Sequence, residues 1–265
     1  MMKSTNVIEY IDGLQTKGRY NFTKLEAKQV SGDSDQVLKL SLWRLVKKRR
    51  IVQVREGFYV IVPLEYASTG LLPPEWFIAD LMKFIGLPYY VGLLSAAAVH
   101  GASHQQPQDF HVVVPKSVRS IRIRNLSIKF FTKTGMQSSP VEDVKTSTGY
   151  MRVSNPAVTA VDLVTYASRV GGLDRVVTVL QELSEKIRSE MLLEAAKKEK
   201  QLAFVQRLGW LLEKEGHEKL VDQLATWISI KKPRETPLDP SQPKKGFSRD
   251  FRWKVIVNAE VEGEL

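Results

Sequence analysis

Basic and polar side chains that could bind phosphates and base edges are concentrated near the start of the sequence. Residues 1–62 hold 12 Lys and Arg against 6 Asp and Glu, whereas the remaining 203 residues hold 27 against 23. Such clustering is typical of a nucleic-acid-binding module, although a solubilising basic surface explains the charge alone equally well. The residues that we expect to contact nucleic acid are Ser34, Gln36, Lys39, Arg44, Lys47, Lys48 and Arg55.

Histidines provide a weaker indication of chemistry. His100 and His104 are four residues apart, a spacing that can hold zinc on one helix face, and His111 follows. Gly101 interrupts the helix between the first two, and no acidic residue lies at a ligand-like offset. We therefore interpret these histidines as surface or loop residues and predict neither a metal nor a cofactor.

Acidic residues raise the alternative of a metal-dependent DNA-processing enzyme. Glu142, Asp143 and Lys145 are the residue types that nucleases use around a metal ion, but their spacing is loose and favours the edge of a hairpin. Asp162 lies on an apolar helix stripe, where we expect it to cap a helix or pair with an arginine. The sequence has neither a phosphate-binding glycine loop nor a G-x-S-x-G motif, so we predict a protein that is not an enzyme.

Composition limits the class of protein further. The chain has 265 residues and a net charge of +10, and it lacks cysteine, which excludes disulfides, Cys-ligated zinc and a cysteine nucleophile. Its first residues do not read as a signal peptide, and no apolar run reaches the roughly 18 residues of a membrane span. We expect a cytoplasmic protein without membrane association.

The basic segment has the order of elements of a winged helix-turn-helix. Ser4 or Thr5 can cap a first helix over residues 7–14, and a short second helix is expected to end at Val30. Ser34 or Asp33 can cap a third helix of about four turns. The alternating runs 51–55 and 58–61 then predict a hairpin that turns at Glu56-Gly57.

The third helix is predicted to enter the major groove of duplex DNA. Leu38, Leu42 and Leu45 share the face that packs on the first two helices, which leaves the polar side chains for base edges and phosphates. Leu40 and Trp43 lie off this stripe, so they either pack on the next domain or form part of a dimer contact. Winged helices also serve as protein-docking modules, and that alternative stays open.

A larger mixed domain is expected to follow, with the boundary between residues 65 and 66. Short branched and aromatic runs predict strands at 110–114, 120–124 and 126–131 and a hairpin over 141–153. Asn155-Pro156 starts a mostly helical region that extends to residue 230, and residues 231–246 form a loop or strap. Residues 251–258 predict a last strand that completes the sheet. The fold class is therefore α+β, with residues 1–65 as the winged-helix domain and 66–265 as a mixed α/β domain with a small sheet and a helical region.

Several short motifs, taken in order, carry a resemblance across nearly the whole chain. They are the Gly57-Phe58-Tyr59 wing strand, Tyr89-Tyr90-Val91-Gly92, Ser95-Ala96-Ala97 before His100-Gly101, Val112-Val113-Val114-Pro115, Val153-Ser154-Asn155-Pro156, Thr159-Ala160-Val161-Asp162-Leu163, Arg207-Leu208-Gly209 with Leu211-Leu212, Leu238-Asp239-Pro240 and Trp253-Lys254-Val255-Ile256-Val257-Asn258. Their order and spacing resemble the AbiEi antitoxins of type IV abortive-infection toxin–antitoxin systems. The sequence departs from the usual pattern at Arg49-Arg50, where a small residue or glycine commonly precedes the wing.

The resemblance implies two activities. The winged helix would repress its own operon by binding inverted repeats in the promoter, and the C-terminal domain would oppose a nucleotidyltransferase toxin without forming a stable complex with it. A winged-helix transcription factor whose second domain senses a ligand or partner is the main alternative, and the DNA-processing enzyme is the second.

Overall fold

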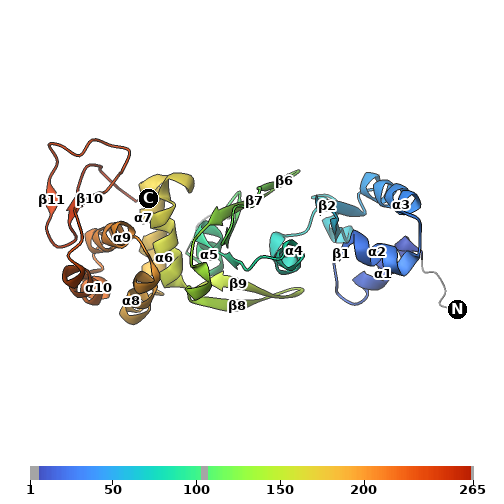
Figure 1. Ribbon diagram of the computed structural model, residues 1–265, viewed down its shortest axis with the longest axis horizontal. Helices are drawn as coiled ribbons and strands as arrows, with labels where there is room; N and C mark the ends of the chain where they lie inside the picture. Colours follow the sequence, from blue (N-terminus) through green and yellow to red (C-terminus); the bar gives the residue numbers. More distant parts are fainter. Residues whose placement is uncertain (1–5, 103–106, 264–265) are drawn as a thin grey trace. The chain divides into compact units, whose positions relative to one another are not determined.

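The computed structural model describes residues 6–102 and 107–263 and has the predicted α+β fold (Figure 1). The helices are α1 (Val7–Gln15), α2 (Lys24–Ser31), α3 (Asp35–Lys47), α4 (Ile78–Ile85), α5 (Leu93–Val99), α6 (Pro156–Thr165), α7 (Gly172–Ser184), α8 (Ser189–Lys198), α9 (Leu202–Lys214) and α10 (Glu218–Lys231), with 3-10 turns η1 (Leu64–Tyr66), η2 (Pro74–Trp76), η3 (Met136–Ser138) and η4 (Ala167–Arg169). The strands are β1 (Asn21–Thr23), β2 (Ile51–Arg55), β3 (Phe58–Ile61), β4 (Tyr90–Val91), β5 (Phe110–Val114), β6 (Ile121–Ile123), β7 (Leu126–Thr132), β8 (Val141–Thr146), β9 (Gly149–Ser154), β10 (Thr236–Pro237), β11 (Arg249–Asp250) and β12 (Val255–Ile256). Among the residues described, no helix combines the length and apolar character needed to cross a membrane.

The strands form three sheets. The first has the order β1-β3-β2 and belongs to the winged helix, and the second has the order β6-β7-β5-β4-β9-β8. In the second sheet β4 runs antiparallel to β5 and parallel to β9. The third sheet, β10-β12-β11, is small and lies near the end of the chain.

Contact density divides the chain into two compact units. The first unit comprises residues 1–89 with the hairpin segments 117–130 and 143–152, and the second comprises 90–116, 131–142 and 153–265. The predicted boundary between residues 65 and 66 lies within η1, and the winged helix forms the first part of the first unit.

Local capping explains where the winged-helix elements begin. The Asn6 side chain accepts a hydrogen bond from Ile8 N and caps α1, whereas Ser4 and Thr5, the predicted caps, lie outside the described residues. Thr23 and Glu26 form a capping box at α2, and Ser34 caps α3 as predicted. Each cap satisfies amide groups that the first turn of a helix leaves without a partner.

The winged helix has a core of its own. Leu38, Leu42 and Leu45 of α3 are buried together with Phe22, as part of a cluster shared by α1, α2 and the sheet. The predicted hairpin is confirmed at residues 51–55 and 58–61. Sequence patterning missed β1, which is only three residues long and pairs Phe22 with Tyr59.

The second unit is built around α6. Asn155 caps this helix through Val158 N, with Pro156 at its first position, as the sequence predicted. Every residue of α6 from Pro156 to Val164 is buried, because α5, α7, α8 and α9 all pack against it. The predicted helical region after residue 154 is thus the core of this unit.

The prediction that residues 251–258 form one strand of the main sheet is wrong. Only Val255–Ile256 is a strand, and it lies in the third sheet. Trp253 is fully buried instead and packs so closely on Gly209 of α9 that a Cβ there would lie 2.1 Å from its ring. Lys254 then takes a left-handed conformation with φ of 54°. Residues 251–258 have the composition of a strand, but the burial of the Trp253 ring against Gly209 interrupts the extended backbone.

Candidate nucleic-acid interface

Helix α3 presents one apolar and one solvent-exposed face. At about 100° per residue, the buried leucines share one side of the helix. The residues on the opposite side are spaced by three and four positions, and all are exposed: Gln36, Leu40, Trp43 and Lys47. Lys39 and Arg44 flank this face on its two sides and are also exposed.

The structure leaves the predicted cations of α3 available to a partner. Lys39, Arg44, Lys47 and Lys48 are exposed, and they form no ion pair with any residue that the structure describes. Ser34 and Gln36 are exposed at the start of the same helix, where the Ser34 hydroxyl accepts from Val37 N at 3.4 Å. The fold therefore brings these six predicted residues onto one helix.

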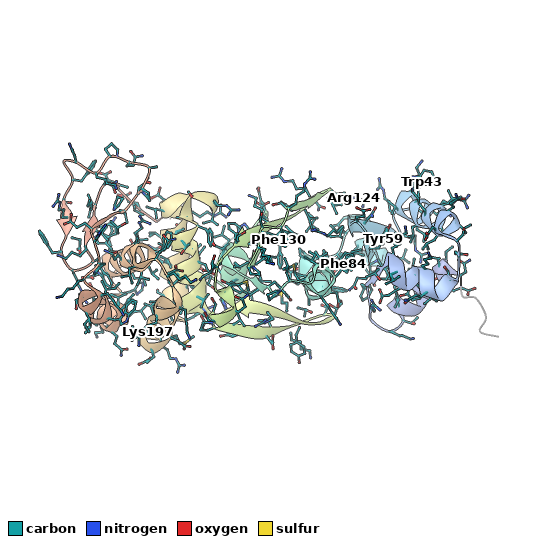
Figure 2. All side chains as sticks on the ribbon, in the orientation of Figure 1. Trp43, Tyr59, Phe84, Arg124, Phe130 and Lys197 are labelled. Atoms are coloured by element: carbon teal, nitrogen blue, oxygen red, sulfur yellow. The ribbon has the colours of Figure 1, made fainter. Side chains whose placement is uncertain are left out.

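Two apolar side chains occupy the middle of this face. Trp43 is 52% exposed and points away from the helical core (Figure 2), and Leu40 is 46% exposed. Lys47 Nζ lies 4.1 Å from the centroid of the Trp43 ring, so the ammonium group and the indole face form a cation–π contact. The predicted dimer contact through Leu40 and Trp43 stays a prediction.

Arg55 lies on the wing, away from α3. It is half-buried at the end of β2 and has no ion-pair partner among the described residues. The wing loop is only Glu56-Gly57, and Lys24 N donates a hydrogen bond to Gly57 O at 2.8 Å. Gly57 has φ of 80°, and a Cβ there would lie 3.4 Å from the Phe84 ring. The wing is therefore short, and its loop contacts the start of α2 and the Phe84 ring within the first unit.

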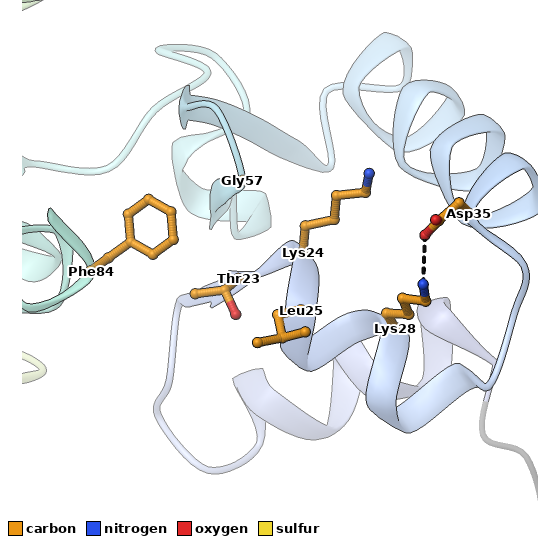
Figure 3. A pocket seen from close by; sticks show the side chains of 7 residues that line it. All are labelled: Thr23, Lys24, Leu25, Lys28, Asp35, Gly57 and Phe84. Atoms are coloured by element: carbon orange, nitrogen blue, oxygen red, sulfur yellow. Dashed lines mark ion pairs between the residues drawn. The ribbon is translucent and has the colours of Figure 1, made fainter.

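A shallow groove borders this short wing (Figure 3). It has a volume of about 420 Å³ and is lined by Thr23, Lys24, Leu25, Lys28, Asp35, Gly57 and Phe84. Lys28 Nζ and Asp35 Oδ1 are 2.8 Å apart, so the only acidic group in this lining is paired. No predicted site residue lines the groove.

Arg49 is a cation that the sequence analysis did not select. It is exposed and has a left-handed backbone with φ of 56°, between the end of α3 and the start of β2. Glycine fits this conformation best, which is a physical reason for the small residue that the resemblance leads one to expect at this position. The neighbouring Arg50 pairs with Asp12 at 2.6 Å, so only Arg49 of the two remains free to meet a phosphate. The unusual Arg49-Arg50 pair is the sequence feature that could have identified Arg49 as a candidate contact.

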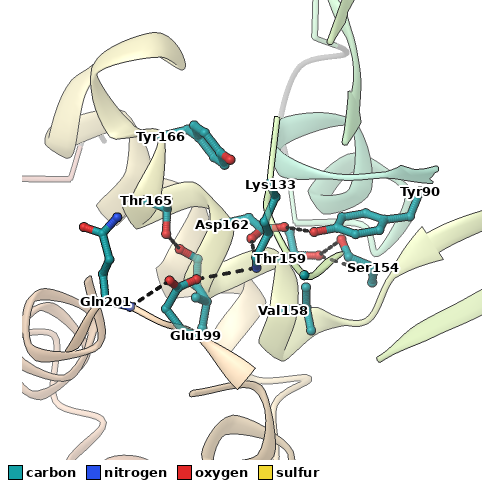
Figure 4. A network of polar contacts seen from close by, with 12 residues as sticks. Tyr90, Lys133, Ser154, Val158, Thr159, Asp162, Thr165, Tyr166, Glu199 and Gln201 are labelled. Atoms are coloured by element: carbon teal, nitrogen blue, oxygen red, sulfur yellow. Dashed lines mark hydrogen bonds and ion pairs between the residues drawn. The ribbon is translucent and has the colours of Figure 1, made fainter. Parts of the chain in front are cut away.

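A buried polar network lies in the second unit (Figure 4). Asp162 is completely buried, 2.6 Å from Lys133 Nζ, and accepts a hydrogen bond from the Tyr90 hydroxyl at 2.8 Å. Glu199 lies 3.7 Å from the same Lys133 nitrogen. The prediction that Asp162 caps a helix or pairs with an arginine is wrong, because its partner is a lysine on the segment after β7, 29 residues away.

Burial and charge oppose each other in this network. Burial raises the pKa of Asp162, and the ammonium group of Lys133 acts against that rise. Burial lowers the pKa of Lys133, but the attraction of Asp162 and Glu199 outweighs it, so the net shift is upward. Burial also raises the pKa of Tyr166, to about 12. The charges satisfy one another inside the unit, which makes this a packing feature.

The acidic cluster considered for nuclease chemistry lies on the surface of one strand. Glu142, Asp143 and Lys145 are exposed on β8. Within residues 6–102 and 107–263, no group of three or more His, Asp or Glu is arranged to hold a metal ion.

The three histidines also differ in their surroundings. The His100 ring nitrogen Nε2 lies 2.7 Å from Ser154 O, and His104 is outside the described residues. His111 is buried in β5 against Phe131, so its interpretation as a surface or loop residue is wrong. All five residues of β5 are buried, so the His111 ring is enclosed whichever face of the strand it lies on.

Together these features define a winged-helix protein with a second, mixed α/β unit. Residues 90–214 match the family model described as the AbiEi antitoxin C-terminal domain. This match confirms the resemblance to AbiEi antitoxins that the motifs showed, over this part of the chain.

A solved structure supports the same fold over the full chain. The RV2827C protein from Mycobacterium tuberculosis matches with a TM-score of 0.66 at 14% sequence identity, covering 95% of this chain and 91% of that one. At this identity the match concerns the fold alone. A search of curated proteins finds no significant match.

Proposed function

We propose that the protein is a DNA-binding transcriptional repressor and the antitoxin of a type IV toxin–antitoxin system. The observation that carries the DNA-binding part is the exposed face of α3, where Lys39, Arg44 and Lys47 lack ion-pair partners among the described residues. The antitoxin part is supported by the AbiEi domain over residues 90–214. The protein would act in the cytoplasm and without catalysis.

The mechanism places α3 in the major groove of duplex DNA. Ser34 and Gln36 lie at the N-terminal end of the helix, where hydrogen-bonding side chains can reach base edges. Lys39 and Arg44 flank the exposed face and would reach bases or the two phosphate backbones. Lys47 and Lys48 at the end of the helix, with Arg55 on the wing, would contact phosphates and fix the position of the protein on the duplex.

The regulatory proposal follows from this mode of binding. Inverted repeats in the promoter would present two equivalent sites, and occupation of both would repress the operon that encodes the protein. The partner in that operon would be a nucleotidyltransferase toxin, which the second unit counteracts without a stable complex.

Replacing Arg44 and Lys47 by alanine tests the DNA interface. We expect the affinity for the protein's own promoter repeat to fall by about 2 kcal/mol, since a good base contact contributes roughly 1–3 kcal/mol. Fluorescence anisotropy with a labelled duplex, at one fixed salt concentration, measures the change. The matched control is Lys197→Ala with Lys198→Ala, which removes two exposed cations from α8. Equal affinities of the parent and the α3 variant would remove both residues from the interface.

Co-expression with the adjacent gene tests the antitoxin role separately. The full chain with Arg44→Ala and Lys47→Ala should still restore growth to cells that express the toxin from an independent promoter, because the second unit is intact. Growth that stays arrested with both the parent and this variant would contradict the antitoxin role. It would then favour a winged-helix regulator whose second unit senses a ligand or partner.

A further inference from the structure

A second concentration of positive charge lies near the end of the chain. The C-terminal strap, residues 231–254, contains eight Lys and Arg and three Asp and Glu. It runs from the end of α10 through β10 and β11 to the start of β12, entirely within the second unit.

The acidic groups of the strap are already engaged within the protein. Glu235 pairs with Arg249 at 3.5 Å, Asp250 accepts from Trp253 N at 2.7 Å, and Asp239 accepts from Ser241 N at 2.8 Å. Besides Lys231, the last residue of α10, five cations of the strap are exposed and form no ion pair with a described residue: Lys232, Arg234, Lys244, Lys245 and Lys254. These cations outnumber the two strap carboxylates that likewise lack an ion pair with a described residue, Asp239 and Asp250, so the strap presents a net positive surface to a polyanion.

Two phenylalanines are exposed among these cations. Phe251 is 75% exposed and Phe247 is 43% exposed, and Lys254 Nζ lies 5.8 Å from the Phe251 ring centroid. Because they are four positions apart, their Cα atoms are at most about 14 Å from each other. Aromatic rings held between cations are the groups on which proteins stack unpaired bases.

The strap is fixed to the unit by buried amide side chains. The Gln206 Nε2 group donates to the carbonyls of Arg234, Trp253 and Lys254, which holds the backbones of two of these cationic residues close together. Asn258 Nδ2 donates to Asp239 O at 2.8 Å and to Pro243 O at 3.1 Å, just before Lys244. The exposed rings and cations are thus carried on an anchored segment.

From these observations we propose that the C-terminal strap binds an unpaired nucleic-acid strand. The five free cations contact its phosphates, and Phe251 and Phe247 stack on its bases. A duplex is a poorer ligand for this surface, because its bases are already stacked on one another and present no free face. The site is separate from α3 and does not depend on the proposed operator binding.

Phe251→Ala in the full chain tests the proposal directly. The probes are fluorescein-labelled 12-mers of oligouridylate and oligothymidylate, whose comparison distinguishes RNA from DNA, and a promoter duplex. We expect the variant to bind the preferred 12-mer about tenfold more weakly, since stacking contributes roughly that factor or more per base. Duplex binding should not change. Phe251→Trp should retain the affinity for the 12-mer, because it keeps an aromatic face.

The charge contribution is tested with Lys244→Ala and Lys245→Ala, against Lys197→Ala and Lys198→Ala as the matched control. The slope of log affinity on log salt for the 12-mer should become shallower by about 0.7 for each phosphate that the variant no longer neutralises, and only in the strap variant. Failure of the parent to bind either 12-mer would overturn the proposal. So would a Phe251→Ala variant that binds as the parent does, or one that loses duplex binding to the same extent.

Discussion

Helix α3 of the first unit and the buried core of the second unit use their positive charges in opposite ways. In the first unit, Arg44 and Lys47 extend into solvent from α3 without a counter-charge among the described residues. In the second unit, Lys133 is largely buried and is held by Asp162 at 2.6 Å, with Glu199 at 3.7 Å. A paired, buried cation contributes to the fold, whereas a cation that the fold leaves unpaired is free to contribute to binding.

This difference separates the effects expected of mutations. Changes in the second-unit core should reduce stability and leave duplex binding intact wherever the protein is still folded. Changes on α3 should do the reverse, because an exposed side chain contributes little to the free energy of unfolding. The following predictions test this separation from the largest expected effect to the smallest.

Trp253→Ala should have the largest effect. The indole is fully buried on Gly209, so its removal should cost about 4 kcal/mol of unfolding free energy in the second unit. Urea unfolding followed by circular dichroism measures this loss. Trp43→Ala is the matched control, because that ring is 52% exposed on α3, and we expect it to change stability by about 0.5 kcal/mol or less. Similar losses of unfolding free energy in the two variants would contradict the expected difference between the buried core and the exposed face of α3.

Asp162→Ala should cost about 3 kcal/mol, because it leaves the buried Lys133 ammonium without its nearest counter-charge. The same denaturation experiment measures it. The double variant Asp162→Leu with Lys133→Met should recover only part of that loss, because it removes the ion pair but leaves Glu199 without Lys133. A single variant that loses less than about 1 kcal/mol would show that the pair is not integral to the core.

Arg49→Gly should stabilise the first unit by about 1 kcal/mol, since glycine adopts the observed left-handed backbone without the cost of a side chain. Thermal unfolding tests this, with Lys48→Gly as the control. Lys48 has φ of −76°, so glycine there should give no gain. If Arg49 also meets a phosphate, the more stable variant should bind the promoter duplex more weakly. A variant that gains no stability would refute the strain at this position.

Most elements of the fold could be predicted from local patterns. The leucine stripe of α3, the alternation of the wing and the Asn155-Pro156 helix start each specify a structure within a few residues. Non-local partners could not be predicted in the same way. Asp162 pairs with a lysine 29 positions away, and Trp253 breaks a strand-like run because Gly209, 44 positions earlier, leaves room for its ring.

For the candidate site, the sequence could predict which residue types lie on the exposed face of α3. Helical periodicity separates Lys39, Arg44 and Lys47 from the buried leucines, and the structure has the same division. The backbone of Arg49 and the tight packing of the wing on Phe84 depend on contacts that a one-dimensional pattern does not contain.

The salt dependence of promoter binding tests the central claim most directly. Affinity for the protein's own promoter duplex should be measured between 50 and 200 mM salt for the parent and for Arg44→Ala with Lys47→Ala. The parent should show a steep decline, with a log–log slope near −0.9 for each phosphate neutralised, and the variant should have a shallower slope and a lower affinity. A flat salt profile, or identical curves for the two proteins, would contradict the assignment of α3 as the DNA-binding helix.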